Sequence, residues 1–260
     1  MAPRFTRHEH ARSRRTLGQN FLADPAAIRR LADAAAPGPD TLLYEIGAGR
    51  GRLTTALLPL CGRLVAYEID ADMAARLPRH PRLTVRTEDF LAARPPAEDF
   101  AVVGNIPYAL TAAVVRWCLD APALRRATLL TQLEYARKRA GDYGRWSRLT
   151  VLTWPEHSWR LAGRVPRDAF RPMPRVDGGI LQIERRAVPL VRPALMPAWR
   201  RLVEEGFTGA GGSLHATLAR RFGDRRAYAA TRAARLGPDV PVGEVWPEQW
   251  LSLFRLLAPR

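Results

Sequence analysis

The chain has 260 residues, of which 47% are hydrophobic, and a formal net charge of +16 at pH 7. This length and apolar content suit one large domain, or a large and a small one, with a substantial core. No apolar run approaches the roughly 20 residues of a membrane span. The basic start lacks the apolar region of a signal peptide, and an Arg-rich mitochondrial presequence is the alternative interpretation of that start. The excess of base over acid favours nucleic acid as partner over an acidic membrane surface.

The two cysteines, Cys61 and Cys118, lie inside apolar helical patterns. They are expected to be buried thiols of a protein in a reducing cytoplasm, not members of a disulfide framework. The five histidines show no ligand spacing, so we expect no metal site.

Residues 1–16 form a basic arm that we expect to be disordered, and that either contacts phosphates or is simply solvated; its arginines are Arg4, Arg7, Arg12, Arg14 and Arg15. Next comes a short apolar-polar stretch containing Asn20 and Leu22. Asp24 and Pro25 then match the N-cap and first position of a helix.

Residues 42–46 are an apolar run of strand length, followed by glycines at 47, 49 and 51 and then by apolar residues at helical spacing from Leu53. Strand, glycine turn and helix open a nucleotide-binding α/β fold, because Gly47 and Gly49 let the backbone approach a ligand at a helix N-terminus. A tight turn without a ligand is the alternative.

Two further strands are expected: 64–70 ends in acidic residues, and 83–86 runs into the acidic residues Glu88 and Asp89. Glu68 lies about 20 residues beyond the glycines, where a carboxylate binds ribose in dinucleotide-type sites; a surface charge is the alternative. Asp89 and Phe90 fit an adenine, with the carboxylate accepting from its amine and the ring against its face. The alternative is that Asp89 caps a turn.

A fully apolar strand, 100–104, delivers Asn105, Ile106, Pro107 and Tyr108. The amino nitrogen of adenine is a poor nucleophile because its lone pair is delocalised into the ring. The Asn105 amide oxygen and the Ile106 carbonyl, directed by Pro107, both accept from that amine, and the Tyr108 face stacks on the extracted base.

Phe170 lies on a proline-spaced loop, and we expect its ring to cover the other face of the base. Without the Asn-Ile-Pro-Tyr motif, the favoured interpretation of Phe170 would be a buried core side chain. The sheet closes at 179–184, and prolines mark a linker near 185–197. We therefore expect a catalytic domain at 17–185 and a helical RNA-binding domain at 186–260, with helices at 198–207, 213–222, 227–236 and 246–257.

These motifs, in this order, resemble the rRNA adenine N6-methyltransferases: residues 18–21 (Gly-Gln-Asn-Phe), 45–51 (Glu-Ile-Gly-Ala-Gly-Arg-Gly), 68–70, 88–90, 105–108 and the Phe-x-Pro-x-Pro-x-Val run from Phe170. The basic arm and the tail from Trp246 are similar to the Erm branch of that family. One departure is Gly178, where related sequences often carry Ser, which puts a loop hydrogen bond in doubt.

The resemblance implies a Rossmann-like class I methyltransferase with a small all-α C-terminal domain, and S-adenosylmethionine as cofactor. It implies cofactor contacts at Asn20, Leu22, Gly47, Gly49, Glu68, Asp89, Phe90 and Asn105, and catalytic roles for Asn105, Ile106, Pro107, Tyr108 and Phe170.

The Erm branch also implies a monomer that adds one or two methyl groups to an adenine of 23S rRNA before ribosome assembly is complete. That modification confers macrolide-lincosamide-streptogramin B resistance. A 16S rRNA dimethyltransferase is the first alternative, and a non-catalytic nucleic-acid-binding factor on the same fold is a remote one.

Overall fold

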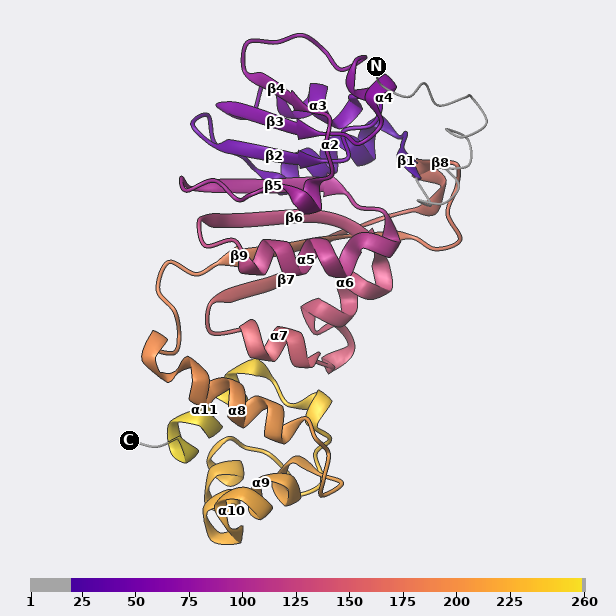
Figure 1. The fold of residues 1–260 in the computed structure, drawn as a ribbon. Coiled ribbons are helices and arrows are strands. Elements are labelled where there is room, and N and C mark those ends of the chain that lie inside the picture. Colours follow the sequence, from indigo (N-terminus) through magenta and orange to yellow (C-terminus); the bar gives the residue numbers. More distant parts are fainter. Residues whose placement is uncertain (1–19, 259–260) are drawn as a thin grey trace. The chain divides into compact units, whose positions relative to one another are not determined.

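The computed structural model describes residues 20–258, which fall into two compact units (Figure 1). Of the described residues, the first unit holds 20–136 and 161–183, and the second holds 137–160 and 184–258. The predicted arm at residues 1–16 lies outside the described part of the chain.

The first unit is built on a sheet with the strand order β4-β3-β2-β5-β6-β9-β7, of which residues 157–160 and 184–185 are grouped with the second unit. The strands are β2 (Leu42–Ile46), β3 (Arg63–Tyr67), β4 (Leu83–Arg86), β5 (Phe100–Asn105), β6 (Leu124–Gln132), β7 (His157–Val165) and β9 (Gly178–Arg185). All pairs from β4 to β6 are parallel. The chain builds the sheet outward from β2 to β4 and then returns to place β5 on the other side of β2. This reversal creates a crevice at the carboxyl ends of β2 and β5, where ligands bind in such sheets.

A separate two-stranded sheet pairs β1 (Phe21–Leu22) with β8 (Phe170–Arg171) in antiparallel fashion, with Leu22 opposite Phe170. The pairing continues beyond the strands, since the Ala23 amide donates to the Ala169 carbonyl at 2.8 Å. The proline-spaced loop is therefore tied to the segment that carries Asn20.

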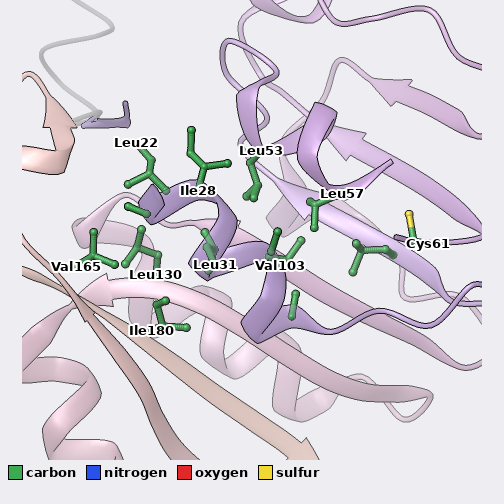
Figure 2. Close-up of a cluster of buried hydrophobic side chains, with 14 of the residues drawn as sticks. Leu22, Ile28, Leu31, Leu53, Leu57, Cys61, Val103, Leu130, Val165 and Ile180 are labelled. Atoms are coloured by element: carbon green, nitrogen blue, oxygen red, sulfur yellow. The ribbon is translucent and has the colours of Figure 1, made fainter. Parts of the chain in front are cut away.

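The helices of the sheet region are α2 (Pro25–Ala35), α3 (Arg52–Leu57), α4 (Ala71–Ala74), α5 (Thr111–Asp120) and α6 (Leu133–Ala140). Asp24 caps α2 as predicted, accepting from the Ala26 amide at 2.8 Å. Figure 2 shows apolar side chains of α2 and α3 gathered with those of the strands in one cluster, which includes Leu31, Leu57 and Leu130. Sheet and covering helices together confirm the predicted α/β class.

The second unit is helical, with α7 (Arg148–Thr153), α8 (Met196–Gly206), α9 (Leu214–Phe222), α10 (Asp224–Ala233) and α11 (Pro247–Leu257). Its core is rich in tryptophan: Trp199 and Trp250 are fully buried, and the Trp199 ring donates to the Leu152 carbonyl at 3.0 Å. Gly206 permits this packing, because a Cβ there would lie 2.3 Å from the Trp250 ring.

The two units divide differently from the predicted boundary between residues 185 and 186. Residues 137–160 group with the C-terminal helices, because Trp146, Val151 and Trp154 belong to the same hydrophobic cluster as Trp199. Burial of these side chains depends on partners about 50 residues away in the chain. Among residues 20–258, no helix is both long and apolar enough to cross a bilayer.

Candidate active site

A cavity opens at the carboxyl ends of β2, β3 and β5, and it brings together ten of the twelve predicted site residues. Its lining includes Asn20, Gly47, Glu68, Asp89, Phe90, Asn105, Ile106, Pro107, Tyr108 and Phe170. The other two, Leu22 and Gly49, line a smaller neighbouring cavity that shares Gly47 and Asn105 with the first. The individual roles of these residues stay predictions, but their assembly at one sheet edge follows from parallel strands ending together.

The glycine turn after β2 has the left-handed backbone that its sequence indicates, with φ of +67° at Gly47 and +55° at Gly49. A Cβ placed on Gly47 would meet no atom within 4 Å. The Gly47 position is therefore open space beside the cavity, available to a ligand that approaches the backbone closely.

Glu68, just beyond β3, is only 3% exposed and is held by two backbone amides. One carboxylate oxygen accepts from Gly49 at 2.7 Å and the other from Asp70 at 2.9 Å. These bonds connect the end of β3 to the glycine turn. A carboxylate has about four acceptor positions, so Glu68 retains capacity for hydroxyl donors of a ligand in the cavity.

Asp89 and Phe90 follow β4 and line the same cavity. One Asp89 oxygen accepts from the Leu91 amide at 2.9 Å, so the predicted alternative of a turn cap is present. The structure gives the second oxygen no hydrogen bond among the described residues, which leaves an acceptor at the cavity. Phe90 is fixed by Trp117, whose ring centroid lies 4.4 Å away.

Asn105 ends β5 and has a defined amide orientation. Its Nδ2 donates to the backbone carbonyl of Asn20 at 2.7 Å. Because a carbonyl accepts only, this partner fixes which end of the amide is nitrogen. The Oδ1 atom is then left as an acceptor in the cavity wall.

Ile106 and Tyr108 surround the proline that follows this strand. The Ile106 side chain is buried, and its amide donates to the Leu130 carbonyl at 3.0 Å, which extends the β5–β6 pairing. The Tyr108 hydroxyl is buried with no hydrogen-bond partner among the described residues. Burial, with a smaller contribution from the negative charge of Asp177, raises the pKa of Tyr108. The phenol is therefore neutral at pH 7 and can donate to a ligand.

Phe170 lies in the cavity wall but is only 1% exposed, and it belongs to the main core cluster. In this conformation its ring offers almost no free face, so stacking on a base requires the loop to shift. Gly178 is matched to this packing: a Cβ there would lie 2.9 Å from Leu130 Cδ1 and 3.1 Å from Phe170 Cζ. Glycine at position 178 therefore lets Leu130 and Phe170 pack closely against the backbone, where a larger side chain would need them to shift.

The loop that carries Phe170 is anchored by Asp177. Its carboxylate accepts from the Arg167 amide at 2.9 Å and from the Arg164 guanidinium at 2.5 Å. These two contacts, in that order, lower the pKa of Asp177.

Glu45 lines the candidate site but is absent from the residues predicted for it. It lies in β2, is 1% exposed, and lines the smaller cavity. Burial raises the pKa of Glu45 to about 7, although the neighbouring Thr54 opposes part of that rise. The available signal was an acidic residue inside an otherwise apolar strand. No group of three His, Cys, Asp or Glu side chains within residues 20–258 is arranged to hold a metal ion.

The fold is that of a Rossmann-like class I methyltransferase. A model of the ribosomal RNA adenine dimethylase family matches residues 10–259. The chain belongs to that family.

Its similarity to individual relatives is also high. An rRNA adenine N-6-methyltransferase of Streptomyces fradiae is 56% identical over 254 residues, covering 95% of this chain and 80% of that protein. The crystal structure of 23S rRNA methyltransferase ErmE matches with a TM-score of 0.89 and 46% identity, covering 92% of this chain and 100% of that one. A ribosomal RNA small subunit methyltransferase A of Thermobifida fusca is 34% identical over 244 residues, covering 87% and 84%. The predicted resemblance to the Erm branch is confirmed.

Proposed function

We propose that this protein transfers a methyl group from S-adenosylmethionine to N6 of an adenine in 23S rRNA, and thereby confers macrolide-lincosamide-streptogramin B resistance. Membership of the family supports the rRNA adenine as substrate. The higher identity to the Erm-type relatives than to the small-subunit enzyme supports the 23S target. We place the protein in the cytoplasm as a monomer that acts on rRNA before ribosome assembly is complete.

The residues present fit the cofactor. Glu68 has acceptor capacity for the two ribose hydroxyls, and the second Asp89 oxygen suits the adenine amine beside Phe90. The open side of Gly47 leaves room for the methionine part, in a cavity that Glu45 also lines. When bound, S-adenosylmethionine supplies a methyl group on a positively charged sulfur.

The observation that carries this proposal is the Asn105–Asn20 hydrogen bond of 2.7 Å. It holds the side-chain amide by its donor end and keeps Oδ1 as an acceptor. An acceptor at that point binds a hydrogen of the target amine, reduces conjugation of its lone pair with the ring, and orients that lone pair. Because the group is already in place before the substrate arrives, little reorganisation is needed.

Tyr108 and the Ile106 carbonyl complete the proposed base site. The Tyr108 hydroxyl has no hydrogen-bond partner among the described residues. It can therefore donate to a base that enters the cavity without first breaking another hydrogen bond. The ring beside it offers a stacking face. The target adenine leaves its own stack to reach these groups.

The direct test is methylation of purified 23S and 16S rRNA, each stripped of protein, with methyl-labelled S-adenosylmethionine and mapping of the modified nucleotide. The proposal predicts a single labelled adenine in 23S rRNA, carrying one or two methyl groups. Labelling confined to 16S rRNA would establish the small-subunit alternative. Absence of cofactor binding in a titration would favour a non-catalytic factor on this fold.

A further inference from the structure

The positive charge is distributed unevenly over the chain. The first unit, counted over residues 20–136 and 161–183, has 17 Arg and 15 Asp or Glu, so it is nearly neutral. The second unit, residues 137–160 and 184–260, has 19 Arg or Lys and only 9 Asp or Glu. The excess of base that indicates a polyanionic partner is therefore concentrated in the helical unit and not around the cavity.

Within the helical unit, the pair α9–α10 is the most one-sided segment. Residues 214–235 contain six arginines and a single acid, Asp224. All six arginines are exposed, and none forms an ion pair with another described residue; they are Arg220, Arg221, Arg225, Arg226, Arg232 and Arg235. Asp224 is itself directed to His215, at 3.3 Å. The guanidinium groups are thus available to an external anion.

The helix α10 separates its residues sharply by face. Ala227, Ala230 and Thr231 are buried against the rest of the unit. Arg225, Tyr228 and Arg232 lie three and four positions apart on the opposite, exposed face. Tyr228 is 57% exposed, and its ring packs edge-on against His215 with centroids 6.4 Å apart. An exposed aromatic between two cations is the pattern of single-stranded nucleic-acid binding.

We propose that the face formed by Arg225, Tyr228 and Arg232 binds a strand of the substrate RNA outside the loop that contains the target adenine. This inference rests on the proposed function and assigns a second RNA contact to it. The two arginines are seven residues apart, or about 10 Å along the helix, so they contact separate phosphates of one strand. Guanidinium groups suit phosphate because they donate two parallel hydrogen bonds. An unpaired base stacks on the Tyr228 ring between them.

The test measures RNA affinity of the full chain at several salt concentrations, with two RNAs. One is a short hairpin carrying only the target loop, and the other is the same hairpin with flanking single strands. For the extended RNA, the double variant R225A/R232A is expected to reduce the slope of log affinity against log salt by about 1.4, since each single-strand phosphate contact contributes about 0.7. Tyr228→Ala is expected to weaken binding at least about fivefold without changing that slope, while Tyr228→Phe retains the affinity.

The matched control is R76A/R79A, which removes the same charge from exposed positions of the first unit. If R225A/R232A and the control have equal slopes and affinities, the inference is wrong. An equal loss for short and extended RNA would also contradict it, because the contact would then lie within the target loop. Methylation of the short hairpin by the unaltered protein tests the proposed function separately, so the two failures are distinguishable.

Discussion

Glu68 offers a test of how the structure couples stability to cofactor binding. In the variant Glu68→Gln, one amide oxygen can still accept from Gly49 or Asp70, but the amide nitrogen then faces the other backbone N–H. Hydrogen bonds to a charged acceptor contribute about 1.5–3 kcal/mol, and a buried donor without a partner costs a similar amount. We expect the first unit to lose about 2–3 kcal/mol, which lowers its Tm by roughly 5–10 °C for a unit of this size.

The assay is thermal unfolding combined with calorimetric titration of S-adenosylhomocysteine at a temperature where both proteins are folded. Glu88→Gln is the matched control, because Glu88 also lines the cavity but is exposed and has no hydrogen bond among the described residues. Glu68→Gln should lower both Tm and cofactor affinity, whereas Glu88→Gln should leave Tm unchanged. Equal Tm values for the two variants would refute the structural role assigned to Glu68.

Two further substitutions test the packing and electrostatics around the site. Burial raises the pKa of Glu45 from 4.5 to about 7. The folded state therefore keeps a proton that the unfolded state releases, and the free energy of unfolding falls as pH rises from about 4.5 to 7. Glu45→Gln should remove this loss, which amounts to roughly 3 kcal/mol at pH 7.5. Urea unfolding at pH 5 and 7.5 measures about 2.5 kcal/mol of this loss, because the rest lies below pH 5; parallel pH profiles for both proteins would contradict the expected effect. Gly178→Ser should destabilise by about 1–3 kcal/mol through contact with Leu130 and Phe170, and an unchanged urea midpoint would show that these neighbours yield freely.

Much of the candidate site was predictable because its residues follow strands. Glu68 and Asn105 come directly after apolar runs, and Asp89 follows β4 by three residues; parallel strands bring their carboxyl ends to one edge. The glycine turn was also predictable from the sequence, and Gly47 and Gly49 adopt the positive φ that such a turn requires. Local sequence therefore suffices where side-chain position follows from strand order.

The remaining features depend on contacts between distant segments. The raised pKa of Glu45 could not be predicted from the sequence, because it results from burial, which depends on tertiary packing. The grouping of Trp146 with Trp199 likewise joins segments about 50 residues apart. Phe170 is both a wall of the cavity and part of the core, and the sequence presented these as alternatives.

The bounds of one C-terminal helix differ from those predicted. The third C-terminal helix was predicted at 227–236, but α10 spans Asp224–Ala233. Gly223, with φ of +84°, ends α9 and is followed at once by the new helix. The apolar spacing that guided the prediction marks the buried face, not the first turn, whose residues are charged.

We propose that the Asn105 side chain, fixed by Asn20, prepares the amine of a flipped adenine for attack. Single-turnover methylation of 23S rRNA by Asn105→Ala tests this role, with RNA and cofactor both saturating and their affinities measured separately. We expect the rate of transfer to fall by about 10²–10³-fold with RNA affinity retained. A rate within roughly tenfold of the unaltered protein would show that Asn105 has no such role.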